Sequence, residues 1–184
     1  MINILGFAGS LRQGSYNRAL LKNCLELLPP DASLEIFGLE GIPPFNQDLE
    51  AAPPPRVAEF RQKIRDADAI LIVTPEHNYS VPGVLKNAID WASRPANAHS
   101  LKGKNVAIMS ASTGMLGGAR AQYHLRQSFV FLDMYAVNKP EVFITFAAQK
   151  FDAQGRLNDE QARELIRVLL KTLVEQTKKA LGKS

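Results

Sequence analysis

The sequence predicts a three-layer α/β domain in which helices flank a five-stranded parallel sheet. Five apolar strand patterns alternate with helical patterns along the 184 residues, and this alternation is typical of parallel sheets with right-handed crossovers. Residues 69–73 are apolar at every position, which fits a strand that is covered on both faces. No repeat, low-complexity segment or linker interrupts the pattern, so we expect residues 1–184 to form a single domain.

The composition is that of a globular protein, with 46% hydrophobic and 22% charged residues. No apolar run approaches the ~18 residues that a membrane span requires, and no basic segment precedes the first apolar run. We therefore expect neither a membrane association nor a secretory signal. The single cysteine, Cys24, excludes an internal disulfide and lies in an apolar helical stripe, which favours a core position over a catalytic thiol. Together these features lead us to expect a cytoplasmic protein.

The formal net charge of +4 raises the question of nucleic-acid binding. The basic residues are scattered, however, and the one local enrichment, between Lys171 and Lys183, still contains Glu175. We therefore expect no nucleic-acid partner. A mildly positive surface can equally attract an anionic cofactor.

The first half of the chain contains two strand patterns and two helical ones. Residues 2–8 form an apolar strand, and residues 19–28 have the apolar spacing of a helix that ends at Pro29-Pro30. Residues 34–37 alternate as in a second strand. Residues 38–55 contain five prolines and no clean period, so we expect a long loop that walls a pocket or meets a second subunit.

The remaining elements follow in the same order. A short helix at 57–67 leads into the strand at 69–73, and a third helix covers residues 84–92. Residues 105–109 and 142–144 form the fourth and fifth strands, with a helix at about 119–132 between them.

The last helix carries an apolar stripe between Leu165 and Val174. Asn158 together with Gln161 has the spacing of a capping box, so we expect the helix to begin there.

Five strands in a chain of this length favour the flavodoxin-like strand order 2-1-3-4-5. In such sheets the ligand binds at the carboxyl ends of the strands, near the point where the strand order reverses. The loops after the first, third and fourth strands, residues 9–17, 74–83 and 110–118, share this edge and have unusual compositions. Their convergence predicts a binding site.

The first loop has the composition of an anion site. Small and hydroxyl-bearing residues lie between a strand and a helix, where backbone N–H groups and the helix dipole favour a phosphate. Arg12 adds a cation, and Ser10, Ser15 and Asn17 add neutral donors. The glycine fingerprint of dinucleotide sites and the Gly-Lys-Ser/Thr of P-loops are both missing. The alternative is an ordinary helix cap at Ser15 with a solvated Arg12.

The second loop combines stiffness with apolar surface, since it contains Pro75, Tyr79 and Pro82. A flat heteroaromatic ring needs such an apolar shelf together with main-chain donors and acceptors at its edge. Glu76 could act as a general base, but a carboxylate bonded to backbone near a helix is the simpler interpretation. His77 could donate a proton, although a ring contact or a surface position is favoured.

The third loop, residues 110–118, carries side chains too small for acid–base chemistry. Its glycines let a ring or a second substrate approach the backbone closely, and the alternative is a plain strand-to-helix turn. No cluster of His, Cys, Asp or Glu has metal-ligand spacing, and no Gly-x-Ser-x-Gly elbow occurs. We therefore expect neither a metal site nor a catalytic triad.

Three segments of the chain carry a family resemblance. They are Gly9-Ser10-Leu11-Arg12-x-x-Ser15-x-Asn17, the stretch PEHNYSVPGVLKNAIDWASR at 75–94, and GARAQYHLRQ at 118–127. The chain resembles the NAD(P)H-dependent FMN reductase family of flavodoxin-like proteins, and within it the bacterial quinone and chromate reductases.

The resemblance implies that FMN is the cofactor and that the flavin N5 atom, rather than a side chain, carries the chemistry. The residues implied to bind the phosphate are Ser10, Arg12, Ser15 and Asn17. Those implied to meet the flavin ring are Pro75, Glu76, His77, Asn78 and Ser112. His77 departs from the family pattern, in which tyrosine is common at this place.

The implied activity is transfer of hydride from NADPH or NADH, through FMN, to small acceptors such as quinones, azo compounds, nitroaromatics or chromate, by a ping-pong mechanism. The resemblance also implies a homodimer or homotetramer, with Arg120, Tyr123 and Glu141 at the matching interface places.

Two alternatives remain open at this stage. A flavodoxin-like electron carrier would bind FMN but act on protein partners, and such carriers tend to be strongly acidic, unlike this chain. A response-regulator receiver domain would need acidic residues after the first and third strands, where this chain has Ser10 and Thr74-Pro75.

Overall fold

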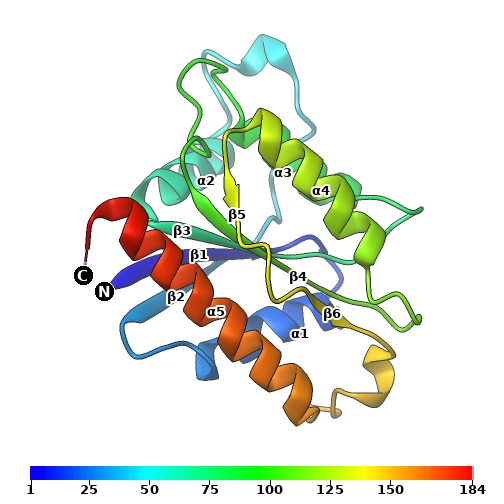
Figure 1. The fold of residues 1–184 in the computed structure, drawn as a ribbon. Coiled ribbons are helices and arrows are strands. Elements are labelled where there is room, and N and C mark those ends of the chain that lie inside the picture. Colours follow the sequence, from blue (N-terminus) through cyan, green and yellow to red (C-terminus); the bar gives the residue numbers. More distant parts are fainter. Residues whose placement is uncertain (184) are drawn as a thin grey trace.

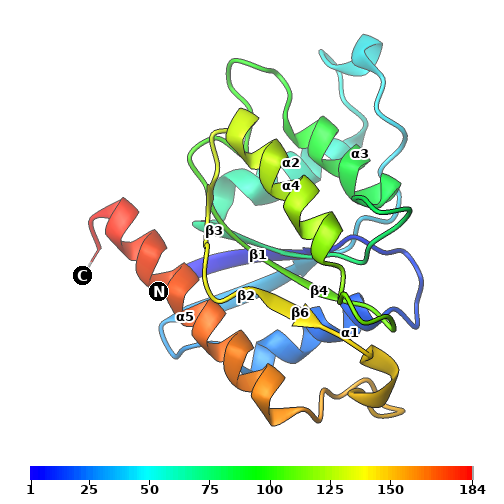
Figure 2. The ribbon, with the colours of Figure 1, turned by 45° about the vertical axis from the view of Figure 1, so that its right-hand side comes forward.

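A computed structural model describes residues 1–183 and has three layers. The strands are β1 (Ile2–Ala8), β2 (Ala32–Phe37), β3 (Ala69–Val73), β4 (Asn105–Ala111), β5 (Tyr135–Ala136) and β6 (Val142–Ile144). The helices are α1 (Tyr16–Asn23), α2 (Pro55–Asp66), α3 (Gly83–Ala92), α4 (Ala119–Phe131) and α5 (Glu160–Leu181). Helices α1 and α5 cover one face of the sheet, and α2, α3 and α4 cover the other (Figures 1 and 2).

The sheet is parallel and has the order β2-β1-β3-β4-β5, which confirms the predicted strand order. The predicted fifth strand, residues 142–144, is β6, and the sheet has one strand more than predicted, since both β5 and β6 pair with β4. Pro140 lies between β5 and β6 and has no N–H to donate to a ladder, so the two do not join into one continuous strand. The two-residue strand β5 has no counterpart in the sequence-based prediction.

Side chains of the central strands alternate between two apolar cores. On β3, for example, Leu71 packs with α1 and α5, whereas Ile70 and Ile72 pack with α2, α3 and α4. Burial on both faces explains why this strand is apolar throughout.

Cys24 lies at the end of α1 in the first core, where it is fully buried. Burial raises the pKa of its thiol to about 12, because the apolar surroundings disfavour the thiolate. The predicted structural role of this cysteine is confirmed.

The long loop at 38–55 is tied to α3. The indole N–H of Trp91 and the side-chain amide of Asn87 both donate to the carbonyl of Pro43, at 2.8 and 2.9 Å. Asn87 in turn accepts from the backbone N–H of Phe45 at 2.7 Å. These bonds satisfy polar groups that would otherwise be stranded beside the core.

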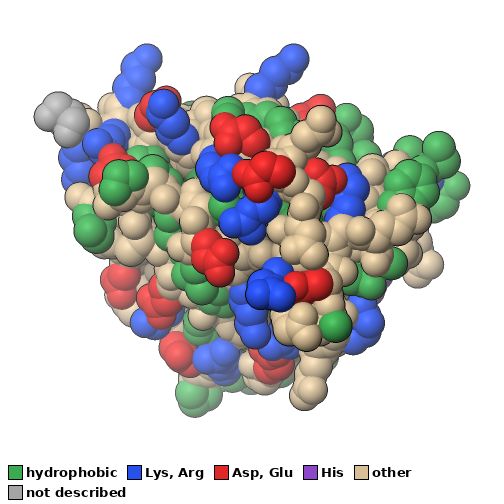
Figure 3. Space-filling view, turned by 90° about the horizontal axis from the view of Figure 1, so that it is seen from below, with side chains coloured by type: hydrophobic (Ala, Val, Ile, Leu, Met, Phe, Trp, Pro, Cys, Tyr) green, Lys and Arg blue, Asp and Glu red, His purple; other side chains and the backbone are tan. Residues whose placement is uncertain are grey.

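Helix α5 is the longest element, and its outer face is charged. Arg167 pairs with Glu160 at 2.8 Å and with Glu164 at 3.0 Å. Acidic and basic side chains are interspersed on the face seen in Figure 3. Within residues 1–183, no helix combines the length and the apolar composition needed to cross a bilayer.

The predicted start of α5 is wrong by one residue. The N-cap is Asp159 rather than Asn158, because the Asp159 carboxylate accepts the N–H of Ala162 at 3.0 Å. The same carboxylate forms an ion pair with Lys150 at 2.7 Å, which the uncharged amide of Asn158 could not do. Helix α1 begins at Tyr16, ahead of the predicted apolar stripe, and Ser15 is its N-cap residue, as in the alternative interpretation of the first loop.

Replacing the α5 cap should destabilise the fold in a pH-dependent way. The hydrogen bond from Lys150, and then the N–H of Ala162, hold the pKa of Asp159 below its usual value. Asp159→Ala should lower the free energy of unfolding by about 0.5–2 kcal/mol at pH 7, the usual cost of losing an N-cap. A carboxyl group whose pKa is lowered by folding stabilises the folded state at pH values above its unfolded-state pKa. The stability difference between the wild type and Asp159→Ala should therefore shrink as pH falls below about 4.

Urea denaturation at pH 7 and pH 3.5 measures this effect. Asp159→Asn is the matched control, because it keeps a capping oxygen and removes only the charge, so it should lose less stability. An equal loss in Asp159→Ala at both pH values would contradict the role of the carboxylate.

Candidate functional site

Three loops meet at the carboxyl ends of β1, β3 and β4 and surround a hollow of about 190 Å³. Eight of the nine predicted site residues line it, which supports the predicted convergence of the loops. They are Ser10, Arg12, Ser15, Asn17, Pro75, Glu76, His77 and Ser112. The ninth, Asn78, is exposed at the tip of the adjoining turn.

The first loop turns directly from β1 into α1. Ser10 accepts the backbone N–H of Arg12 on its hydroxyl at 3.3 Å, and the N–H of Ser15 donates to the carbonyl of Arg12 at 3.1 Å. Ser15 has the extended backbone of an N-cap, yet among residues 1–183 its hydroxyl makes no capping bond. That hydroxyl, the exposed Arg12 and the first N–H groups of α1 therefore remain available to an anion.

Asn17 joins the first loop to the third. Its buried side-chain amide donates to the carbonyl of Ala111 at 2.9 Å and accepts the N–H of Ala111 at 2.8 Å. The amide nitrogen carries a second proton, so these two bonds leave one donor for a ligand. Asn17 thus fixes the position of α1 against the end of β4.

The second loop contains a tight turn between His77 and Ser80. The N–H of each donates to the carbonyl of the other, at 3.1 and 2.9 Å. Asn78 and Tyr79, the two central residues, both have positive φ, at 49° and 66°. This is the backbone of a two-residue hairpin turn, which directs the chain back toward α3.

Glu76 anchors this loop to the start of α4. Its carboxylate accepts the backbone N–H of Arg120 at 3.1 Å and the guanidinium Nε–H at 2.6 Å. The Arg120 guanidinium also lies 3.5 Å from the centre of the Tyr79 ring. This confirms the interpretation of Glu76 as a carboxylate bonded to backbone near a helix, and it gives no support to a free general base.

A second contact holds the same turn on α4. The Nδ1 atom of His124 lies 2.9 Å from the hydroxyl of Ser80. Together with the Glu76–Arg120 pair, this contact fixes both ends of the turn. His77, between them, has an exposed side chain, as expected for a ring contact or surface position.

The third loop is fixed by its junction with α4. Gly118 caps the helix with φ of 88°, and a Cβ atom there would lie 2.7 Å from the Cβ of Ser110. Both constraints require glycine. The buried amide of Gln122 donates to the Ser110 hydroxyl at 2.7 Å and to the carbonyl of Val142 at 2.9 Å.

Ser112 is held on the side of the loop that faces β6. Its N–H donates to the carbonyl of Ile144 at 3.0 Å, and its own carbonyl accepts the N–H of Ala147 at 2.9 Å. These bonds bring Ser112 and Thr113 to the wall of the hollow.

Three lining residues were missed by the sequence reasoning: Tyr16, Ala111 and Thr113. Tyr16 and Thr113 directly follow the predicted site residues Ser15 and Ser112, so the sequence located their loops but not these two side chains. Ala111 lines the hollow through its position at the end of β4, which no side-chain chemistry reveals.

The hollow is therefore cationic and rich in hydroxyl groups at the α1 end, and is walled by Pro75 and the anchored turn at the other. Such a site suits an anion attached to a flat ring. Within the described part of the chain, no group of three His, Cys, Asp or Glu side chains is arranged to hold a metal ion.

Several known proteins are similar to this chain in sequence and in fold. Residues 2–149 match the family described as NADPH-dependent FMN reductase. An NAD(P)H-dependent FMN reductase of Pseudomonas aeruginosa is 56% identical over 94% of this chain and 93% of its own length. An NAD(P)H:quinone oxidoreductase of Solanum tuberosum is 44% identical over 100% of this chain and 96% of its own.

A solved structure agrees with these matches. The flavoenzyme NAD(P)H:(acceptor) oxidoreductase of Paracoccus denitrificans superposes with a TM-score of 0.89 at 32% identity, covering 98% of this chain and 99% of its own. Sequence, site and fold thus lead to one assignment: the chain belongs to the NADPH-dependent FMN reductase family.

Proposed function

We propose that this protein is an FMN-dependent reductase that oxidises NADPH or NADH and reduces small quinone-type acceptors. The observation that carries the proposal is the single hollow in which an open helix N-terminus, a cation and a stiff loop meet. The family assignment and the quinone reductases among the relatives support it.

The α1 end of the hollow suits the FMN phosphate. Arg12 supplies a charge-assisted contact, while Ser10, Ser15 and the remaining amide proton of Asn17 supply neutral donors. The N–H groups at the start of α1 add the field of the helix dipole.

The other end suits the flavin ring. Pro75 offers an apolar surface, the backbone of Glu76, His77 and Asn78 offers donors and acceptors for the ring edge, and Ser112 closes the far side. Arg120 neutralises the Glu76 carboxylate, so the loop brings no uncompensated negative charge to the ring.

When bound, FMN supplies the two-electron hydride chemistry that links NAD(P)H to the acceptor. The side chains of the hollow then bind and orient, since none has to act as an acid or base. One shared hollow admits NAD(P)H and the acceptor only in turn, which supports ping-pong kinetics. Quinones, azo compounds, nitroaromatics and chromate are the proposed acceptors.

An electron carrier that acts on protein partners is the alternative function. Such carriers tend to be acidic, and the net charge of +4 does not favour one. Oxidation of NAD(P)H with a small quinone alone, without a partner protein, separates the two functions.

The protein reconstituted with FMN should be yellow, and its absorbance near the flavin maximum should bleach on addition of NADPH or NADH under anaerobic conditions. A small quinone should restore the colour, and initial rates at several fixed quinone concentrations should give parallel double-reciprocal lines. Heat-unfolded protein is the control. Protein that takes up no FMN would overturn the proposed function, and intersecting lines would overturn the ping-pong order.

Arg12→Ala should weaken FMN binding by roughly 10–150-fold, because a charge-assisted contact contributes about 1.5–3 kcal/mol. Isothermal titration of the apo-protein with FMN measures this. Arg65→Ala removes an exposed arginine of α2, away from the hollow, and should bind FMN like the wild type. Equal affinities of the Arg12 and Arg65 variants would contradict the proposed phosphate position.

We also propose that the protein is a homodimer or homotetramer that uses the outer face of α4. Arg120, Tyr123, Val130 and Phe131 follow one stripe of this helix, and Glu141 is exposed just before β6. Val130 and Phe131 are 84% and 86% exposed, and contiguous exposed apolar surface is typical of interfaces. The N-terminal end of the stripe lies beside the turn that Arg120 anchors, so a partner subunit that covers this end would border the flavin ring.

Phe131→Glu should therefore convert the assembly to monomers at micromolar concentration, because it buries a charge in the apolar contact. Sedimentation velocity measures the change. Val168→Glu, on the outer face of α5, is the matched control and should leave the assembly intact. A wild-type protein that sediments as a monomer would contradict the proposal.

A further inference from the structure

We propose that the groove beside the phosphate end of the hollow binds the adenylate half of FAD, so that the protein holds either FMN or FAD. The inference rests on the proposed function and extends it to a second nucleotide subsite.

The groove lies between α1 and the segment 151–156 and has a volume of about 710 Å³. It exceeds the 190 Å³ hollow and falls in the range of roughly 300–1,000 Å³ that is common for ligand sites. Ser15 and Tyr16 line both spaces, so the groove begins where the phosphate is expected. A group attached to that phosphate through a second phosphate would therefore extend into the groove.

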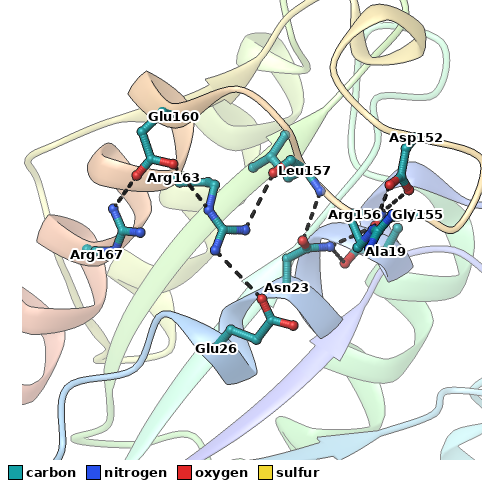
Figure 4. A network of polar contacts seen from close by, with 10 residues as sticks. All are labelled: Ala19, Asn23, Glu26, Asp152, Gly155, Arg156, Leu157, Glu160, Arg163 and Arg167. Atoms are coloured by element: carbon teal, nitrogen blue, oxygen red, sulfur yellow. Dashed lines mark hydrogen bonds and ion pairs between the residues drawn. The ribbon is translucent and has the colours of Figure 1, made fainter.

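The two walls of the groove are fastened together before any ligand binds (Figure 4). The side-chain amide of Asn23 donates to the carbonyls of Ala19 and Gly155, both at 2.8 Å, and accepts the N–H of Leu157 at 2.9 Å. Gly155 has φ of 79°, and a Cβ atom there would already touch the Cβ of Ala19 at 3.4 Å. A preformed groove spares the ligand the entropic cost of ordering the segment.

The half-buried ring of Tyr16 offers a surface for a base, and the buried ring of Phe151 supports it from the core. The rings of Tyr16 and Phe151 lie 5.4 Å apart with an interplanar angle of 39°, and both residues line the groove. A purine can stack on such a surface. The exposed amides of Gln13 and Gln154 lie on the rim, where they can hydrogen-bond its polar edge.

The charges of the groove suit a diphosphate. Arg18, Lys22 and Arg156 line it together with the carboxylates of Asp152 and Glu26. Arg18 also pairs with Glu40, which lies outside the groove lining. Both carboxylates have cationic partners. Asp152 accepts a hydrogen bond from Nε–H of Arg156 at 2.7 Å, and the Glu26 carboxylate lies 3.6 Å from a guanidinium nitrogen of Arg163.

Asp152 is committed to its own turn. One carboxylate oxygen accepts the N–H groups of Gln154 and Arg156, at 2.9 and 2.8 Å. These backbone bonds and the Arg156 side chain lower the pKa of Asp152. Its charge therefore stabilises the turn, and Lys22 stands in the groove as an exposed cation for the ligand.

FAD fits this arrangement better than a pyridine nucleotide. The groove continues from the phosphate end, whereas a nicotinamide has to reach the flavin ring at the opposite end, beside Pro75 and His77. A ligand covalently joined to the bound phosphate needs no second entry to the site.

Isothermal titration of the apo-protein with FMN and with FAD tests the inference. Wild-type affinities for the two flavins should agree within about tenfold. Ala153→Trp fills the groove with an uncharged side chain from its exposed rim, and should weaken FAD at least tenfold while changing FMN less than twofold. Lys22→Glu should likewise raise the ratio of the FAD to the FMN dissociation constant; the ratio cancels any charge effect common to both flavins.

Ala58→Trp, on the exposed surface of α2 across the sheet, is the matched control and should leave the ratio unchanged. FAD binding more than a hundredfold weaker than FMN in the wild type, or a ratio that neither groove variant changes, would overturn the inference. A third result would also overturn it: in Ala153→Trp, an unchanged ratio of the FAD to the FMN dissociation constant together with a raised KM for NADPH of the FMN-loaded enzyme. The groove would then bind the pyridine nucleotide. A wild-type protein that fails to bind FMN overturns the proposed function itself, so the two failures are distinguishable.

Discussion

The site depends on one pair of hydrogen bonds, between the Asn17 side chain and the backbone of Ala111. The pair crosses from the first turn of α1 to the last residue of β4, and it is buried, so losing it would strand polar groups at a cost of about 1–3 kcal/mol each. It holds the helix N-terminus at the edge where β1, β3 and β4 end. It adds a side-chain link between the first and third loops to the backbone bonds that join the strands.

A second constraint, the Glu76–Arg120 pair, links the site to the surface of the molecule. Arg120 holds the loop at the end of β3 through its backbone and its guanidinium, and it also belongs to the exposed stripe of α4. In the proposed assembly, a residue shared in this way would connect a neighbouring subunit directly to the ring site. Arg120 therefore both neutralises the Glu76 carboxylate near the proposed ring site and contributes to the outer surface of α4.

The sequence predicts the parts of this structure whose signal is local. Strand 69–73 is apolar throughout, and the three loops on one edge follow from strand order alone. β5 is too short to carry a periodic pattern, and Asp159 competes with the adjacent Asn158 for the same cap. The composition of the first loop pointed to the phosphate donors, and the family resemblance implied the ring contacts, which periodicity does not distinguish from their neighbours.

The contacts that organise the site have no local signal. Glu76 and Arg120 are 44 residues apart, and Asn17 and Ala111 are 94 apart. The groove likewise forms between α1 and a segment more than a hundred residues later, so only the folded chain reveals it.

The burial of Cys24 has a chemical consequence for an enzyme that meets quinones. Quinones are Michael acceptors that arylate thiolates, and an exposed cysteine near neutral pH presents a reactive fraction of that form. The only sulfhydryl of this chain is enclosed between α1 and the sheet, with its pKa raised to about 12. Burial thereby withholds the one thiol of the protein from the electrophiles it is proposed to reduce, and so protects it from arylation by its own substrates.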